Sequence, residues 1–219
     1  MQKIMFNEKY GLETSVLNGT KTMTRRQFYI PEKLQYLYMP DDTIRIYDTQ
    51  RAGYVIQWCD SNENVRITFY PKYNIGEVVA IAQSYKNISD SGYSVDSRYD
   101  SFRTENWDEN KRVCGRLKTH HGWNNKMFVK ADLMPHHIRI TDVKAERLQD
   151  ISEEDCLKEG IVDYGLEYDD YGDPQYGYKG SQMFINPIDA FRSLIDKVSG
   201  KETWNIDPYV WVYEFELID

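Results

Sequence analysis

The sequence predicts an α+β fold, in which a curved mixed sheet or small barrel carries helices at its rim. Two observations lead to this prediction. The elements expected along the chain run strand, helix, many strands, two helices and strand, and they do not alternate as βα units. Aromatic residues make up 14% of the chain and include 18 tyrosines, a composition that favours strands over helices.

The chain is expected to begin with a short strand and a helix. Lys3–Phe6 has the composition of a strand. Asn7 can cap a helix whose apolar residues recur at helical spacing as far as Leu17, and Gly19 supplies its C-terminal stop. Thr22–Tyr29 is then expected to form the second strand.

The middle of the chain is expected to be rich in strands. The four predicted segments are Thr43–Tyr47, Gly53–Trp58, Asn64–Tyr70 and Glu77–Tyr85. Between residues 86 and 125 the pattern decays into Ser, Asp, Asn and Arg with few aliphatic residues. This composition predicts a long loop or an insertion, and loops of this length are usually functional or mobile.

The last third of the chain is expected to hold two helices between two strands. Ser152 and Asp155 resemble a capping box and mark the start of the first helix. Pro187 favours the first turn of the second helix, and Gly200 ends it. The expected elements are a strand at His137–Leu148, a helix at Glu153–Glu159, a loop rich in Tyr, Asp and Gly at Val162–Gln182, a helix from Pro187 to Val198 and a strand at Tyr209–Leu217.

The charge distribution excludes a uniformly basic nucleic-acid-binding protein and leaves room for a local basic patch. The chain has 35 acidic and 27 basic residues, a formal net charge of -8. Ten of the acids lie between Asp150 and Asp173, whereas residues 111–130 contain six basic residues and no acid. This acidic stretch, not a uniform acidity, carries most of the negative charge.

Membrane insertion and disulfide bonding are not expected. No apolar run approaches the roughly 20 residues of a membrane span, and the first residues become polar too quickly for a signal peptide. Cys59, Cys114 and Cys156 are widely spaced and form neither a disulfide framework nor a zinc motif. A reducing cytoplasm is the expected location. The sequence does not predict an oligomeric state.

A dense cluster of donors and positive charge, Asn18–Arg26, follows the first expected helix. Its lysine, three hydroxyls and two adjacent arginines suit an anion, a nucleotide or a polar small molecule, although a turn leading into a solvated strand has the same composition. Lys21 can share a site with Thr24 only if Lys21 lies in the turn before strand pairing begins. Arg25 and Arg26 must point opposite ways in a strand, and Arg26, on the side of Thr24, is expected to face a ligand.

Cations and aromatic residues are interleaved in the basic segment. Such a mixture can grip phosphates and stack bases, and a solvated loop is the alternative. The residues concerned are Lys111, Arg112, Arg116, Lys118, Lys126 and Lys130, with His120, His121, Trp123 and Phe128. No metal site is expected, because adjacent histidines on a strand face opposite ways, with no cysteine or carboxylate at zinc-ligand spacing beside them. The acidic loop Glu167–Asp173 lacks the spacing of an EF-hand.

Four segments, in order, resemble the ASCH domain family. Gly19–Arg26 is similar to the family signature G-x-K-T-x-T-x-R, and Gly76 begins a segment similar to its glycine-led central strand. Residues 147–161 resemble the strand-to-helix segment, and Trp204 with Pro208–Phe215 resembles the C-terminal strand. The resemblance implies a single domain over residues 1–219, enlarged by insertions at about 35–73, 86–125 and 163–183.

The resemblance implies a PUA-like β-barrel, a fold often used to hold RNA or a modified base, with Lys21 in a cleft. Some small ASCH proteins hydrolyse cytidine acetylated on its exocyclic amine, and their lysine, threonine and glutamate match Lys21, Thr24 and Glu159. Larger relatives often carry Arg-Glu-x-Trp after the glycine-led strand, where this chain reads Ala82-Gln83-Ser84-Tyr85. A charged pair is therefore absent from that position.

The function expected from these observations is recognition of a nucleobase or nucleoside, free or in RNA, in a polar cleft around Lys21, Thr24 and Glu159. The residues expected to contact the ligand are Thr22, Arg25, Arg26, Arg112, Arg116, Lys118 and Trp123. An amidohydrolase acting on acetylated cytidine is the first alternative, and it needs a lysine pKa lowered by burial or by nearby arginines. A protein-interaction module using the acidic tyrosine-rich loop is the second. No cofactor is expected, and Lys21 and Glu159 can also form a purely structural salt bridge.

Overall fold

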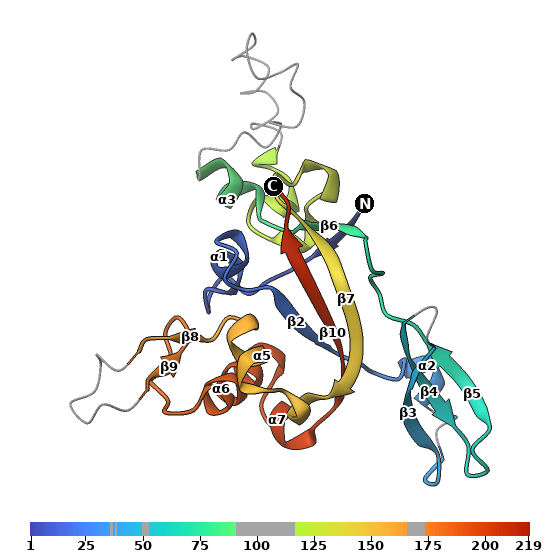
Figure 1. Ribbon diagram of the computed structural model, residues 1–219. Helices are drawn as coiled ribbons and strands as arrows, with labels where there is room; N and C mark the ends of the chain where they lie inside the picture. Colours follow the sequence, from blue (N-terminus) through green and yellow to red (C-terminus); the bar gives the residue numbers. More distant parts are fainter. Residues whose placement is uncertain (36, 38, 50–52, 91–116, 166–173) are drawn as a thin grey trace.

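The computed structural model describes residues 1–35, 37, 39–49, 53–90, 117–165 and 174–219. These residues form a mixed α and β structure with several sheets and short helices, which confirms the predicted α+β class (Figure 1). The largest sheet has five strands in the order β1-β6-β7-β10-β2. Their bounds are β1 (Gln2–Ile4), β2 (Met23–Gln27), β6 (Val78–Ile81), β7 (His137–Arg147) and β10 (Tyr209–Leu217).

The two longest strands, β7 and β10, form the centre of this sheet. β10 pairs antiparallel with β7 on one side and with β2 on the other, and only β1 and β6 run parallel. Residues 210–213 of β10 are all buried, because both faces of the strand are covered. A run of β-branched and aromatic residues suits such a position.

Figure 1 shows the sheet curved along its long strand β7, and the described strands do not close into a barrel. β1 and β2 are the two opposite edges, and no hydrogen-bonded ladder joins them within the described residues. Their neighbourhoods nevertheless meet, because the Arg26 side chain on β2 donates a 2.6 Å hydrogen bond from Nη2 to the carbonyl oxygen of Met5, next to β1. This contact brings the two edges to one site.

Three helices lie near one end of the curled sheet, as Figure 1 shows. They are α5 (Glu153–Lys158), α6 (Pro187–Ser199) and α7 (Thr203–Ile206). Asn186 caps α6 by accepting a hydrogen bond from the backbone of Ile188, Pro187 occupies its first turn, and Gly200 ends it. The apolar stripe of α6, which includes Phe191 and Leu194, is buried in the main core. The sequence did not predict α7.

The first helix begins later than predicted. Helix α1 spans Leu12–Leu17, and Gly11 at its N-cap position has a φ of 77°. No side chain caps this helix, and Asn7 contributes only its backbone carbonyl, which accepts a 3.0 Å hydrogen bond from Leu12. Positive φ at Gly11 interrupts the helical path, so the residues between Asn7 and Gly11 form turns.

A separate three-stranded antiparallel sheet forms within the expected insertion at 35–73. Its strands are β3 (Thr43–Asp48), β4 (Tyr54–Cys59) and β5 (Val65–Phe69), and the short helix α2 (Glu32–Gln35) precedes them. It extends to one side of the main sheet in Figure 1. It packs on the main body through Ile56, which is buried in the main core. In addition, Tyr209 donates from its hydroxyl to the carbonyl of Ile44 at 2.8 Å, and the rings of Phe28 and Phe69 lie 4.9 Å apart.

The structure describes part of each of the other two predicted insertions. Tyr85, expected at the end of a strand, begins helix α3 (Tyr85–Asp90), and Ile88 on that helix packs into a second small core. Further on lie the 3-10 turns η2 (His121–Trp123), η3 (Lys126–Phe128), η4 (Ala131–Leu133) and η5 (Leu148–Asp150). The expected tyrosine-rich loop contains the short strands β8 (Val162–Asp163) and β9 (Tyr176–Gly177). Residues 91–116 and 166–173 lie outside the described part.

Candidate functional site

Lys21 lies in the turn between α1 and β2, as the geometric argument required. Gly19, with a φ of +73°, turns the chain before strand pairing begins at Met23. Lys21 is 2% exposed, and its Nζ donates to the Met23 carbonyl at 2.7 Å, the Glu159 carbonyl at 2.6 Å and Glu159 Oε2 at 2.7 Å. Three acceptors match the three protons of an ammonium group, so the site holds Lys21 as a cation.

The local sequence around Glu159 fixes its position. Ser152 caps α5 by accepting from the Asp155 backbone, which is half of the predicted capping box. Asp155 does not complete the box, because its carboxylate binds Arg25. Gly160 follows with a φ of +102°, and a Cβ there would lie 3.4 Å from Cδ of Lys21. Glycine therefore permits both the turn after α5 and the close passage of the lysine stem.

Two opposing effects act on the pKa of the Lys21 ammonium group. Burial lowers the pKa of its ammonium group from the ordinary value, and the nearby charges of Arg26 and Arg25 act in the same direction. The Glu159 carboxylate opposes both by hydrogen bonding and charge. Burial outweighs the carboxylate, so the net change in the pKa of Lys21 is downward.

Arg25 projects into a cluster of carboxylates. Its guanidinium lies 2.6 Å from Glu146 Oε1, 2.8 Å from Asp155 Oδ2 and 3.3 Å from Glu159 Oε1. Burial disfavours the charged form of Arg25 and so lowers its pKa. The surrounding carboxylates outweigh burial, and the net effect is a raised pKa. In return, Arg25 holds the pKa of Asp155 below its ordinary value although burial pushes it up. We call this set of residues, Arg25, Glu146, Asp155 and Glu159, the carboxylate cluster.

Arg26 points the other way, as the alternation of a strand requires. It is half-buried, its Nη2 binds the Met5 carbonyl, and its guanidinium lies 5.6 Å from the centre of the Phe6 ring. No carboxylate of the described residues lies within ion-pair distance of it. Burial lowers the pKa of Arg26. The donors that Met5 does not use remain available to a ligand.

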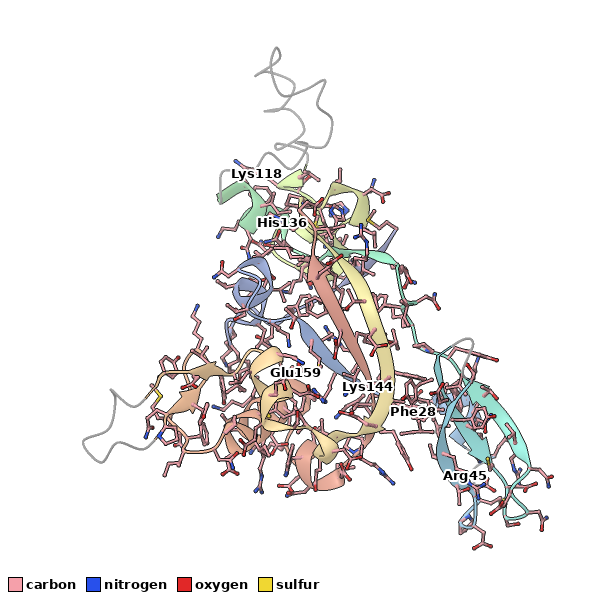
Figure 2. The ribbon with its side chains drawn as sticks, in the orientation of Figure 1. Phe28, Arg45, Lys118, His136, Lys144 and Glu159 are labelled. Carbon is pink, nitrogen blue, oxygen red and sulfur yellow. The ribbon has the colours of Figure 1, made fainter. Side chains whose placement is uncertain are left out.

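Lys21, Thr24, Arg26 and Glu159 line one cavity of about 480 Å³, so the structure brings the predicted lysine, threonine and glutamate together. Figure 2 shows Glu159 between α5 and β2. The rest of the wall is largely apolar and comes from the chain after β1, from α1 and from α6. Its main members are Met5, Phe6, Leu12, Phe191, Leu194, Ile195 and Val198. We call this space the lysine cavity.

Of the other predicted ligand residues that the structure describes, Arg25 lines the lysine cavity, whereas Thr22, Lys118 and Trp123 do not. Thr22 uses its backbone to bind the Lys158 carbonyl at 3.0 Å. Lys118 lies 5.8 Å from the centre of the Trp123 ring, and neither residue lines the cavity. The predicted residues Arg112 and Arg116, with Lys111, lie outside the described part, as does the acidic stretch Glu167–Asp173.

Lys126 and the histidines differ from their expected surroundings. Lys126, assigned to the basic segment, lines the lysine cavity and binds Glu13 at 2.7 Å, Glu8 at 2.8 Å and the carbonyl of Phe6. It is therefore an internal ion-pair partner. His120 and His121 lie in and beside a 3-10 turn, not on a strand. No group of three potential metal ligands occurs among the described residues.

Sequence reasoning missed the apolar wall and the carboxylate cluster. The helical spacing of Phe191, Leu194 and Ile195 marks a buried face but does not show that part of it borders a cavity. Gln83, at the position of the missing charged pair, is buried and donates to Glu13 Oε1 at 3.1 Å, while its own carbonyl oxygen has no partner within the described residues. Glu13 and Lys126, distant in sequence, form a charged pair nearby.

Comparison with known proteins found no matching family model, no matching curated protein and no matching solved structure. Of the helices that the structure describes, none has both the length and the apolar character that a membrane crossing requires.

Proposed function

We propose that this chain recognises a nucleobase or nucleoside, free or within RNA, in the lysine cavity. The observation that carries the proposal is the composition of this cavity: a polar side formed by Lys21, Glu159, Thr24 and Arg26 faces an apolar wall. A volume of about 480 Å³ lies in the range of small-molecule sites, which combine mostly apolar walls with a few convergent polar groups.

A flat heterocycle matches this division of the walls. Its faces are apolar and suit Phe6 and Phe191, while its edge carries donors and acceptors. Arg26 offers guanidinium donors, and Thr24 offers a hydroxyl that both donates and accepts. The Lys21–Glu159 pair adds a fixed dipole beside them. These groups support recognition by hydrogen bonding at the edge of a base.

We further infer that the chain is a large member of the ASCH family with a PUA-like barrel. The sequence resemblance and the curl of the five-stranded sheet, whose edges meet through Arg26 and Met5, support this inference. A cytoplasmic location fits the same picture. Cys59 and Cys156 are buried free thiols, and burial raises the pKa of Cys156 to about 12, which makes it an inert packing residue.

The proposal is tested by calorimetric titration with cytidine, N4-acetylcytidine, uridine, adenosine and guanosine. Thr24→Val and Arg26→Gln should each weaken binding about tenfold or more, because each removes a hydrogen-bonding group from the polar side. Thr68→Val and Arg45→Gln are the matched controls and should leave affinity unchanged. Figure 2 shows Arg45 on the three-stranded sheet, well away from Glu159. Failure of the wild type to bind any nucleoside or RNA would overturn the proposal.

A second candidate, hydrolysis of acetylated cytidine, is favoured by the 2.7 Å contact between Lys21 Nζ and Glu159 Oε2 in a cavity that also contains Thr24. Water would add to the acetyl carbon, the C–N bond would break, and the amine of cytidine would leave with a proton. Lys21 donates hydrogen bonds to three acceptors as an ammonium cation. It must therefore first transfer a proton, for example to Glu159, before it can act as a base or nucleophile.

Acetate release from N4-acetylcytidine distinguishes the two functions. An amidohydrolase should release acetate faster as the pH rises through the lowered pKa of Lys21, and Lys21→Arg should abolish turnover because guanidinium stays protonated. A pure recognition protein should release no acetate at any pH. Turnover that survives Lys21→Arg would refute the lysine mechanism.

A further inference from the structure

A second cavity of about 750 Å³ lies where the three-stranded sheet meets the main body. Its walls come from the chain that leaves β2, from the start of β3, from Arg147 at the end of β7 and from the chain between α7 and β10. Figure 2 shows Phe28, one of its lining residues, between the two sheets. We call this space the junction cavity.

A stacked platform forms part of its wall. The Arg147 guanidinium lies 3.9 Å from the centre of the Tyr209 ring, and Arg147 Nη1 donates to the Asp207 carbonyl at 2.9 Å. Tyr209 is fixed in turn by its hydrogen bond to Ile44. Two planar groups held in this way offer a flat, positively charged surface, which suits the face of a base and the phosphate beside it.

The charge of the junction cavity supports an anionic ligand. Its carboxylate, Asp42, is buried and accepts from Trp58 Nε1 at 2.8 Å and from the Met39 backbone at 3.0 Å, with Arg66 3.4 Å away. Asp42 is therefore compensated inside the protein. No carboxylate of the described residues forms an ion pair with Arg147, which leaves Arg147 as an uncompensated charge on the cavity wall.

The two cavities are neighbours. Tyr29 lines both of them and is 66% exposed, while Gln27 lines only the lysine cavity and Ile30 only the junction cavity. Ile206, which also lines the junction cavity, is 70% exposed. A ligand that leaves the lysine cavity past Tyr29 therefore reaches the junction cavity directly, and Tyr29 offers an aromatic face on the way.

We propose that the junction cavity binds a second nucleotide, so that the ligand of this protein is a single-stranded oligonucleotide. One base would occupy the lysine cavity, the chain would pass Tyr29, and a neighbouring base would stack on the platform of Arg147 and Tyr209 with its phosphate near the guanidinium. This inference rests on the proposed recognition of a base in the lysine cavity. It assigns a role to the inserted three-stranded sheet, which completes the second site.

The test compares a nucleoside with single-stranded tetranucleotides of RNA and of DNA in fluorescence or calorimetric titrations. Wild-type protein should bind a tetranucleotide at least about tenfold more tightly than the nucleoside, because stacking of one additional base contributes that much. Arg147→Gln should weaken tetranucleotide binding about tenfold and leave nucleoside affinity unchanged. Arg139→Gln, an exposed arginine on the same strand that lines neither cavity, should change neither affinity.

A second variant, at an exposed position where a substitution should not disturb folding, tests the same inference independently. Ile206→Glu places a negative charge on an exposed position of the junction cavity and should weaken tetranucleotide binding, whereas Ile185→Glu, at an exposed position that does not line that cavity, should not. Nucleoside binding with no gain for either tetranucleotide, or a gain that both cavity variants retain, would overturn this inference alone. Absence of binding to nucleoside and tetranucleotide alike would overturn the proposed function as well.

Discussion

The two sides of strand β2 use adjacent arginines in opposite ways. Arg25 is enclosed by three carboxylates, and every one of them lies within 3.3 Å of its guanidinium. Arg26 has one backbone carbonyl and an aromatic ring as its neighbours and borders the lysine cavity. The ion pairs of Arg25 link β2 to β7 and α5 within the protein. Arg26 has no such carboxylate partner among the described residues, so its charge is available to a ligand.

The largest expected effect separates these two arginines. Arg25→Gln should lower the free energy of unfolding by about 3 to 5 kcal/mol, because it leaves buried carboxylates without their cation. Arg26→Gln should cost about 1 kcal/mol, the contribution of one hydrogen bond. Urea denaturation followed by circular dichroism measures both. Equal losses for the two variants would remove the contrast between the two sides.

A smaller effect is expected where Lys21 passes Gly160. Gly160→Ala should destabilise the fold by about 1 to 3 kcal/mol, because the new Cβ enters a positive-φ conformation and meets Leu12 at 3.2 Å and Lys21 at 3.4 Å. Gly19→Ala is the matched control, since its φ is +73° and nothing lies within 4 Å of the added Cβ. The excess loss in melting temperature for Gly160→Ala therefore reports the crowding by Leu12 and Lys21, and equal losses would show that both side chains yield without cost.

The smallest expected effect is a pH dependence from the carboxylate cluster. Arg25 lowers the pKa of Asp155 in the folded protein relative to the unfolded chain, so the unfolded chain binds the proton more readily. This contribution to stability is complete above the unfolded pKa of about 4 and is lost as the pH falls through the folded pKa. The stability difference between wild type and Asp155→Asn should therefore shrink below pH of about 4. A difference that stays constant down to pH 2 would contradict the assignment.

Local pattern was sufficient for most strands and for the motif. The segment Tyr209–Leu217 is rich in aromatic and β-branched residues, which favour strands, and its observed bounds are the predicted ones. The positions of Lys21 and Thr24 also follow from local geometry, since Gly19 turns the chain before pairing begins. The first helix was misplaced because Gly11, not Asn7, decides where its helical path begins.

The chemistry of the site depends on contacts between distant residues, which a single sequence does not reveal. Arg25 meets Glu146 and Asp155 only after β7 and α5 have packed against β2. In the sequence Lys126 belongs to a basic segment, but in the structure its side chain forms an ion pair with Glu13. In each case the sequence supplies a charge, and the partner that neutralises it lies more than 100 residues away.

The central position of β10 has a consequence for how this protein forms. β10 pairs Val210 with Gln27 of β2 and with Glu146 of β7, and it follows all the other elements in the chain. β2 and β7 have no ladder with each other, so they cannot be joined until synthesis has reached β10. Closing so long a loop is entropically costly, and folding dominated by such distant pairs is slow. Nascent chains will therefore expose the unpaired edge of β7 during translation, a state in which chaperones are most needed.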